Sequence, residues 1–430
     1  MTKNYDYDVA VIGGGFAGLA AAREASSLGK SVVLIEASER LGGRTWTETR
    51  LGTRIELGGT DVHWLQPHVW SEIKRYQLSL EEFTPPEQLL YLDNGEVREG
   101  SDDAVFGLMD KGMTALADLA RALYERPHEP RFSNAAIEHD KLTLGEFLDG
   151  VPMSKLERDM TSSFWAAACQ APLEKAGLTL PLRWLALSGW DWRLMLDVIS
   201  RYKIVGGMGL LSDGIRSDTH AEFIMGKAVT EVSEAQSHVT LTLSDSTMIS
   251  AAAVVCAVPV NVLSRITFNP PHQHAEKLGA SGQISGGQKV VCRIKGNRTP
   301  YMAFAPEGHP FVLLQYDRPI DSDHIAVAFG SDASAVDGSS ITEVEKVLRT
   351  WLPDVEVLEV ATHNWTKDAL YRGTWAVPGP GQLVEQLNAV EARDGRVLLA
   401  GADIASGSYA LIDGALATGI RAGRDAAAVS

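Results

Sequence analysis

The segment that decides the fold is YDYDVAVIGGGFAGLAAAREASSLGKSVVLIE, residues 5–36. Asp8 to Ile12 is an apolar run rich in β-branched residues, which predicts a strand buried on both faces. The Ala- and Leu-rich segment that continues to about Leu28 predicts a helix, Gly29 ends it, and Ser31 to Ile35 predicts a second strand. We therefore expect an α/β protein that begins with a Rossmann-like βαβ unit.

The turn between the first strand and the helix has the spacing G-x-G-x-x-G. Gly13 permits a tight turn, Gly15 lets the backbone approach a pyrophosphate, and Gly18 lets the helix pack closely on the strand. Ala17 lies in the same turn, where the first N–H groups of the helix attract a phosphate. Glu36, at the tip of the second strand, can accept both hydroxyls of an adenosine ribose. An ordinary βαβ turn would explain the glycines alone, but the whole set favours a dinucleotide, either FAD or NAD.

The bulk composition describes a globular protein of two or three domains. The chain has 430 residues, 45% of them hydrophobic, and no apolar run approaches the roughly 20 residues of a membrane span. The first residues lead directly into the first strand, so we expect no signal or transit peptide. Three dispersed cysteines argue for reduced thiols in a cytoplasm and against a metal site. A net charge of −16 argues against nucleic acid as a partner.

A second glycine pair follows Glu36 and precedes an arginine, in the order Gly42-Gly43-Arg44. Taken alone, this tripeptide is a surface loop with a solvated arginine. Placed shortly after the ribose-binding tip, it can set a guanidinium against the pyrophosphate, and this favours FAD.

The chain resembles the flavin-containing amine oxidase family through these motifs together with Glu56-Leu57-Gly58-Gly59. Two further stretches, 62–70 and 126–130, resemble its nicotine, 6-hydroxynicotine and pseudooxynicotine oxidase branch. The resemblance implies a Rossmann-like FAD-binding domain of the glutathione-reductase type, formed by residues 1–80, 202–280 and 380–430. It implies a second α+β domain for the substrate, formed by residues 81–201 and 281–379.

The resemblance also implies which residues hold the cofactor. Gly58, Gly59 and Thr60 belong to the motif that begins at Glu56. The backbone N–H and C=O of Val229 are expected to contact the edge of the adenine ring. Asp403 stands where the family usually has glutamate, in contact with the ribityl or pyrophosphate region. The helix that begins near Ile412 is expected to aim its N–H groups at the flavin N1–C2=O edge.

Covalent attachment of the flavin is not expected. Thr374 occupies the position at which monoamine oxidases bond the flavin through a cysteine, and threonine cannot form that thioether. The resemblance therefore implies FAD that is bound non-covalently.

The spacing of residues 288–294 gives two alternatives for Lys289. Val290, Cys292 and Ile294 form one apolar face of a strand, so Lys289 lies on the other face, where a solvated lysine is the ordinary outcome. In the family, a lysine at this position holds a water against flavin N5, and we expect Lys289 to be the catalytic residue.

The resemblance implies a substrate cavity in which Trp375 is one wall of the family's aromatic cage. Leu411 stands where the second wall is often tyrosine, so simple primary monoamines are disfavoured. Tyr316 is expected in the cavity by analogy with relatives. His63 either lines the cavity or is a structural, hydrogen-bonded histidine.

The resemblance thus implies oxidation of a small-molecule amine, with hydride or its equivalent leaving the carbon next to nitrogen and the resulting imine or iminium hydrolysing. The branch resemblance implies a nicotine-type pyridine alkaloid as the substrate, and dioxygen or a redox protein is the expected acceptor. The resemblance implies a homodimer. A desaturase or biosynthetic dehydrogenase on the same fold, and a non-catalytic flavoprotein that binds a partner, are the alternatives.

Overall fold

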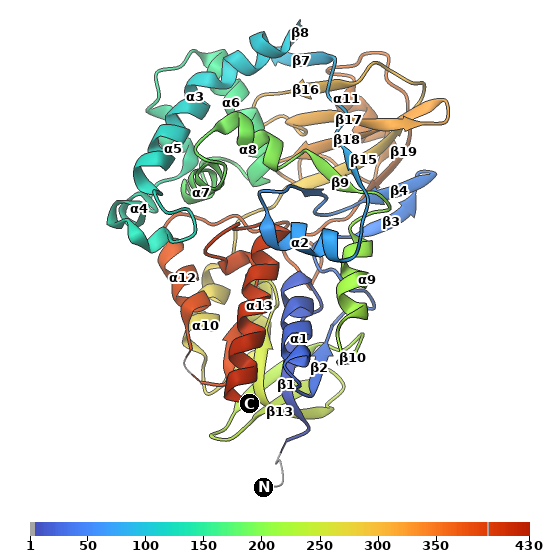
Figure 1. Ribbon diagram of the computed structural model, residues 1–430. Helices are drawn as coiled ribbons and strands as arrows, with labels where there is room; N and C mark the ends of the chain where they lie inside the picture. Colours follow the sequence, from blue (N-terminus) through green and yellow to red (C-terminus); the bar gives the residue numbers. More distant parts are fainter. Residues whose placement is uncertain (1–4, 394) are drawn as a thin grey trace.

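The structure is a computed structural model that describes residues 5–393 and 395–430. The first residues, on which the expectation of no leader peptide rests, therefore lie partly outside the described residues. Figure 1 shows a lower half, which holds both chain termini, and an upper half built around a second sheet. The chain crosses between the halves several times, so each half combines segments that are distant in sequence.

An eight-stranded sheet organises the lower half (Figure 1). Its parallel part has the order β10-β2-β1-β13-β20, with bounds Glu222–Ile224, Val32–Ile35, Tyr7–Ile12, Met248–Cys256 and Val397–Leu399. The amino-terminal part of β13 also pairs with an antiparallel extension, β12 (Val239–Leu243) and β11 (Val229–Glu234), which ends at β14 (Thr267–Asn269). β1 and β2 are buried almost throughout, because helices cover one face and further elements cover the other. The predicted strand–helix–strand unit is confirmed.

Two long helices lie side by side on one face of this sheet (Figure 1). They are α1 (Phe16–Ser27) and α13 (Ile412–Val429), which come from opposite ends of the chain. Glycine makes their close approach possible, because a Cβ at Gly419 would lie 2.1 Å from the Ala17 carbonyl oxygen. Further helices complete this half: α2 (Pro67–Arg75), α9 (Gly209–Ser217), α10 (Gln273–Ser281) and α12 (Leu383–Glu391).

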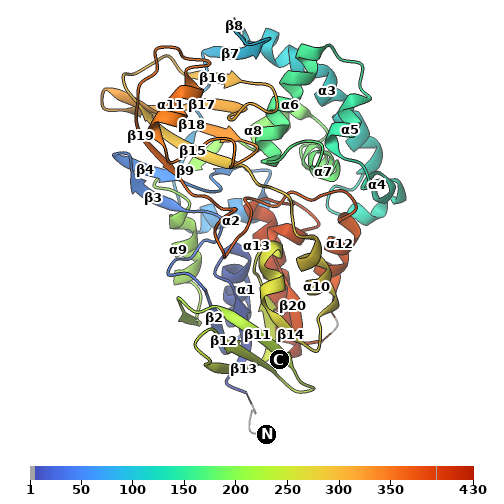
Figure 2. The same cartoon turned by 180° about the vertical axis from the view of Figure 1, so that it is seen from behind.

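A seven-stranded sheet organises the upper half (Figure 2). Its order is β19-β15-β18-β17-β16-β7-β8, with bounds Val357–Thr362, Gln288–Ile294, Asp323–Gly330, Leu313–Ile320, Tyr301–Phe304, Gln88–Asp93 and Glu96–Gly100. Val290, Cys292 and Ile294 pack into the core on one face of β15, beneath α11 (Ile341–Leu348). Lys289 and Val291 therefore point from the other face, toward the lower half.

A helical layer stands beside the upper sheet (Figure 1). It comprises α3 (Asp102–Leu123), α4 (Asn134–His139), α5 (Leu144–Asp149), α6 (Lys155–Cys169), α7 (Thr179–Leu187) and α8 (Trp192–Val198). Trp165, Trp184 and Trp192 are buried in its core, and large aromatic side chains of this kind contribute much of the buried apolar area. The mixed α/β fold is thus as expected, while the exact limits of the two domains stay a prediction.

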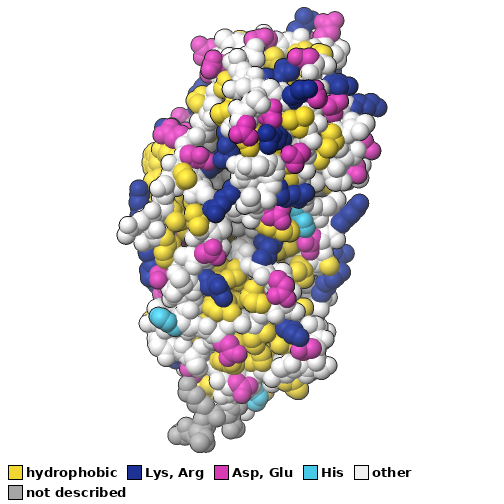
Figure 3. Space-filling view, turned by 90° about the vertical axis from the view of Figure 1, so that its right-hand side faces the viewer, with side chains coloured by type: hydrophobic (Ala, Val, Ile, Leu, Met, Phe, Trp, Pro, Cys, Tyr) yellow, Lys and Arg dark blue, Asp and Glu magenta, His cyan; other side chains and the backbone are white. Residues whose placement is uncertain are grey.

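Short strands join the two halves. They form a hairpin, β3 (Thr47–Arg50) with β4 (Thr53–Glu56), and a small sheet of β5 (Asp61–Val62), β9 (Tyr202–Ile204) and β6 (Leu80–Glu82). Acidic and basic side chains are interspersed over the face drawn in Figure 3, so the acidic excess does not gather there into one patch. Within the described residues, no helix has the length and apolar character needed to cross a bilayer.

Candidate active site

A pocket of about 390 Å³ lies where the two halves meet. It combines the first glycine turn, the loop 42–45 and residues 57–59 with segments that follow much later in the sequence. Those later segments contribute residues 227–230, 257–266, 369–375 and 410–415. The pocket thus collects the separate motifs that the sequence singled out.

Two helices begin at the wall of this pocket, and neither has a side-chain cap. The N-cap of α1 is Gly15 and the N-cap of α13 is Leu411, and no side chain in the described part of the chain caps either helix. The first N–H groups of a helix have no partner inside the helix, and they carry a partial positive charge. The pocket therefore offers two separate places for anionic or electron-rich atoms of a ligand.

Glu36 is held rigidly at one end of the pocket. Its Oε2 accepts a hydrogen bond from the Gly14 N–H at 2.6 Å, and its Oε1 accepts from the Ser38 N–H and hydroxyl, both at 2.8 Å. The turn beneath it needs glycine, because Gly13 has a φ of +101° and a Cβ at Gly18 would lie 1.8 Å from the Gly13 oxygen. The carboxylate is therefore fixed at the mouth of the βαβ turn, where hydroxyl groups of a ligand can reach it.

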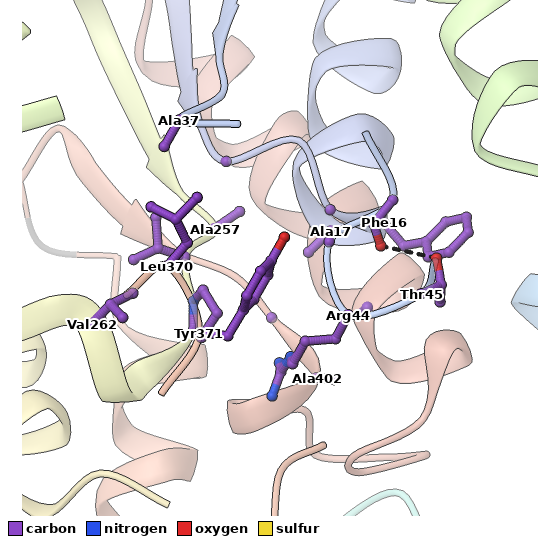
Figure 4. Close-up of a pocket in the computed structure, with 18 of the residues that line it drawn as sticks. Phe16, Ala17, Ala37, Arg44, Thr45, Ala257, Val262, Leu370, Tyr371 and Ala402 are labelled. Carbon is purple, nitrogen blue, oxygen red and sulfur yellow. Dashed lines mark hydrogen bonds between the residues drawn. The ribbon is translucent and has the colours of Figure 1, made fainter. Parts of the chain in front are cut away.

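Arg44 reaches the pocket from the second glycine loop. Arg44 and Tyr371 both line the pocket, and Figure 4 shows the Tyr371 hydroxyl on the side of Ala17 and the Arg44 guanidinium pointing away from Ala17. The Arg44 guanidinium donates to the Thr374 carbonyl oxygen at 3.2 Å and forms an ion pair with Asp403. Asp403 also accepts from the Val260 N–H at 2.9 Å, and it is 2% exposed. Asp403 itself is not among the residues that line the pocket, so its expected contact with the cofactor stays a prediction, and what the structure gives it is the ion pair with Arg44.

Lys289 lies at the inner end of the pocket. Its Nζ donates to the Gly58 carbonyl oxygen at 3.1 Å and to the Thr60 hydroxyl at 2.7 Å. Lys289 is 8% exposed, so the alternative of a solvated surface lysine is wrong. Burial lowers the pKa of its ammonium, although the carboxylates of Asp61 and Glu56 oppose that shift. Thr60 contacts Lys289 but does not line the pocket, whereas Gly58 and Gly59 do.

Apolar and aromatic side chains form the walls around Lys289. Trp375 and Leu411 both line the pocket, and the Trp375 indole donates to the Ala168 carbonyl oxygen at 2.8 Å, which fixes the ring. Thr374 lines the pocket as well, and its hydroxyl donates to Ser285 Oγ at 2.7 Å. One buried amine, one aromatic face and one aliphatic face therefore meet in a single enclosed space.

Comparison with known proteins decides the family. A sequence model described as "Flavin containing amine oxidoreductase" matches residues 16–427. The chain belongs to that family. Pseudooxynicotine dehydrogenase from a Pseudomonas species is 34% identical over 98% of this chain and 86% of its own length. Nicotine dehydrogenase from Pseudomonas putida is 35% identical over 98% and 88% of the two chains, respectively.

Further comparisons extend the similarity. The (S)-6-hydroxynicotine oxidase of Paenarthrobacter nicotinovorans is 28% identical over 96% of this amine oxidoreductase and 97% of its own length. Among solved structures, wild-type putrescine oxidase bound to putrescine gives a TM-score of 0.84 at 24% identity, over 97% and 98% of the two chains. Cyclohexylamine oxidase from Brevibacterium oxydans gives 0.84 at 21% identity, over 98% and 99%. The structural likenesses show that the fold is the same.

The residues of the pocket fit the flavin that membership of the family implies. The uncapped start of α1, with Arg44 opposite, suits a phosphate group. The uncapped start of α13 suits an electron-rich ring edge. Val229 and Ile412 both line the pocket, and their expected roles toward adenine and flavin stay predictions.

Gln170 also lines the pocket, and the sequence analysis missed it. The residue is fully buried and has a φ of +49°, a left-handed conformation that is uncommon outside glycine and is often found at functional sites. Among the described residues, its Oε1 has no hydrogen-bond partner, although its Nε2 donates to the Ala167 carbonyl oxygen at 3.3 Å. Gln170 is a polar residue within the otherwise apolar run 164–173, and this signal could have identified it.

Two residues expected in the cavity lie elsewhere. Tyr316 packs on the opposite face of β17, stacked on His324 at 5.2 Å, and its hydroxyl donates to Asn297 Oδ1 at 3.1 Å. The prediction that Tyr316 lines the cavity is therefore wrong.

His63 is structural. It accepts a hydrogen bond from the Leu65 N–H on Nδ1 at 3.1 Å, so its Nε2–H donates to Asp197, also at 3.1 Å. Burial lowers the pKa of His63, which keeps the ring neutral. Of the two alternatives left open by the sequence, the hydrogen-bonded structural histidine is the one found.

Proposed function

We propose that this amine oxidoreductase binds FAD non-covalently and oxidises the bond between a substrate nitrogen and its neighbouring carbon. The observation that carries the proposal is the meeting of Lys289, Trp375 and the uncapped start of α13 at one end of a pocket. Glu36 and the uncapped start of α1 mark the other end of that pocket. This distribution supports a long dinucleotide, with adenosine near Glu36 and the reactive ring near Lys289.

Non-covalent binding is supported by the chemistry of Thr374. A hydroxyl cannot form the thioether that a cysteine at this position can form, and the Thr374 hydroxyl is already engaged with Ser285. We therefore expect FAD to be held by Arg44, by the helix starts and by the backbone of the glycine motifs.

When bound, FAD supplies the chemistry by accepting a hydride from the carbon next to the amine nitrogen. The amine must be neutral, because its lone pair drives this loss. For a substrate with a pKa of about 10, deprotonation at pH 7 costs roughly 4 kcal/mol. The walls formed by Trp375 and Leu411 lower that cost by withdrawing water from the charged form. The unpartnered Gln170 Oε1 can accept an N–H of the substrate and so orient it.

The substrate we propose is a nicotine-type pyridine alkaloid amine. Relatives named nicotine dehydrogenase and pseudooxynicotine dehydrogenase support this class, and a flat pyridine ring can stack on the aromatic wall formed by Trp375. Relatives are named both as oxidases and as dehydrogenases, so dioxygen and a redox protein are both proposed acceptors. We further propose a cytoplasmic homodimer.

An anaerobic spectral screen tests the proposal. The purified protein is mixed with nicotine, 6-hydroxynicotine, pseudooxynicotine, plain alkylamines and activated alkenes, and bleaching of the flavin band is followed. We expect pyridine alkaloid amines to bleach the flavin fastest. Bleaching by alkenes but not by amines would favour a desaturase, and no bleaching by any compound would contradict an enzymatic role.

A further inference from the structure

A second, polar cavity lies on the far side of Lys289 from the large pocket. It measures about 60 Å³, and Lys289 lines both spaces. Water needs about 10–15 Å³ of such volume together with polar partners, so several waters fit. The charged groups that face this cavity come from β4, β5, β6, β9, β15 and β17, and they are Arg54, Glu56, Asp61, Glu81, Lys203, Lys289, Asp317 and Arg318.

Four of these groups, Lys203, Asp317, Arg318 and Glu81, form a series of ion pairs that begins with buried side chains and ends with partly exposed ones. Lys289, at the inner end, is 8% exposed. Lys203 and Asp317 form an ion pair with side chains that are 15% and 7% exposed. Asp317 also pairs with Arg318 at 3.1 Å, and Arg318 pairs with Glu81 at 3.2 Å, with side chains that are 34% and 42% exposed. Charged groups therefore line the cavity both beside the buried amine and at the exposed ion pairs.

One oxygen in this lining requires water. Glu56 Oε1 accepts from the Thr47 hydroxyl at 2.6 Å and from the Met208 N–H at 2.7 Å. Glu56 Oε2 is buried and has no partner among the described residues. Because a buried carboxylate oxygen without a hydrogen bond is costly, a water in the adjoining cavity is the natural partner.

Burial brings the pKa of the Lys289 ammonium closer to the pKa values of the Asp61 and Glu56 carboxyls. Burial raises the pKa of the Asp61 carboxyl and also that of the Glu56 carboxyl, whereas burial lowers the pKa of the Lys289 ammonium. An ammonium and a carboxyl normally differ by about six pKa units, which makes proton transfer between them unfavourable. Opposite shifts reduce that difference, so a proton moves between the two groups at lower cost.

We propose that this cavity is a water-filled proton path that connects Lys289 to the solvent, with Asp61 as the group that holds the proton nearest to Lys289. A proton leaves Lys289 Nζ through water for the Asp61 carboxylate, giving a neutral amine and a carboxylic acid, and the reverse step restores both charges. Asp61 is a positioning and proton-holding group rather than a catalytic residue.

The path rests on the proposed function, because amine oxidation requires a proton to cross this boundary. A neutral amine that loses a hydride becomes an iminium ion. Dioxygen that receives the hydride's two electrons and proton needs one further proton to leave as hydrogen peroxide. A one-electron redox protein takes the electrons alone and leaves the hydride's proton behind. With either acceptor, one proton must pass between the site and the solvent.

The test compares Asp61→Asn with Asp213→Asn in the FAD-loaded protein, because Asp213 is an exposed residue of α9 and its loss changes the net charge equally. The visible absorbance of the resting protein is titrated with pH, with no substrate present. The quantity of interest is the apparent pKa of Lys289, read from the flavin absorbance. We expect it to fall by about one unit in Asp61→Asn, because an anion near Lys289 is lost. It should stay unchanged in Asp213→Asn. An unchanged pKa in both variants would overturn the proposal.

Proton delivery is measured separately. The flavin is reduced with dithionite, so the measurement does not depend on amine oxidation, and reoxidation by dioxygen is followed. We expect Asp61→Asn to slow reoxidation about tenfold or more, with a larger solvent isotope effect and partial rescue by formate. Slowing without isotope effect or rescue would show a structural role only and would overturn the proposal.

A cavity-filling variant covers the case in which Asp61→Asn does not fold. Val327 lines the second cavity, and Val327→Leu adds one methylene there without any change of charge. We expect slower reoxidation with an enlarged isotope effect, and reoxidation at the wild-type rate would refute a water-filled path. Failure of the alkaloid screen alone would contradict the proposed function but not the path.

Discussion

Removal of the Asp403 charge by Asp403→Asn is expected to weaken FAD binding, because the ion pair with Asp403 positions the Arg44 guanidinium. The carboxylate accepts from the Arg44 guanidinium and from the Val260 N–H, and its side chain is 3% exposed. Asparagine keeps one oxygen and replaces the other with an N–H₂ donor, so one of these two donors loses its acceptor. A hydrogen bond to a charged group contributes about 1.5–3 kcal/mol. At about 1.4 kcal/mol for each tenfold change, we expect the Kd for FAD to rise about 10- to 100-fold.

The assay is titration of the FAD-free protein with FAD, followed by quenching of flavin fluorescence. The matched control is Asp110→Asn, which breaks a surface ion pair with Arg193 whose side chains are 49% and 64% exposed. Exposed pairs contribute little, so the control is expected to leave the Kd unchanged. A Kd in Asp403→Asn that equals the control would refute the indirect role of Asp403.

Three further predictions concern the same pocket. Lys289→Met should retain FAD, as judged by the visible spectrum, while its reduction or reoxidation rate in stopped-flow measurements falls about a hundredfold; unchanged rates would remove Lys289 from the mechanism. Gly18→Ala would place a Cβ 1.8 Å from the Gly13 oxygen, so we expect loss of bound flavin and a lower Tm. The control is Gly107→Ala, which has open space around its Cβ and should raise the Tm slightly. Leu411→Tyr supplies a second aromatic wall, so kcat/KM for simple primary monoamines should rise relative to alkaloid amines; an unchanged ratio would contradict Leu411 as a specificity determinant.

Local sequence patterns could predict the glycine turn of the pocket, because its glycines are required by the backbone conformation of the turn itself. Gly13 and Gly18 are required by the turn in which they stand, and the spacing itself carries that information. Lys289 was placed correctly relative to Val290 because side chains alternate along a strand. The same rule could not place Tyr316. β17 is partly or fully buried on both faces over Leu313 to Tyr316, so alternation alone does not tell which face meets the pocket.

Other features of the site depend on partners that are distant in sequence. The hydrogen bond of His63 to Asp197 spans 134 positions, and no spacing rule reveals it. The ion pair of Asp403 with Arg44 spans 359 positions, and no local pattern indicates it. Gln170 escaped notice because its role depends on a left-handed backbone at the end of α6. These features depend on tertiary packing rather than on local pattern.

The central claim is that one pocket holds FAD without a covalent bond, and its most direct test is the flavin content of the purified protein. The protein is loaded with FAD, separated from excess cofactor and precipitated with acid, and the flavin in the supernatant and in the pellet is identified by chromatography. The account predicts one FAD per chain, released entirely into the supernatant. A colourless protein that takes up no FAD, or flavin that stays attached to the precipitated chain, would contradict it.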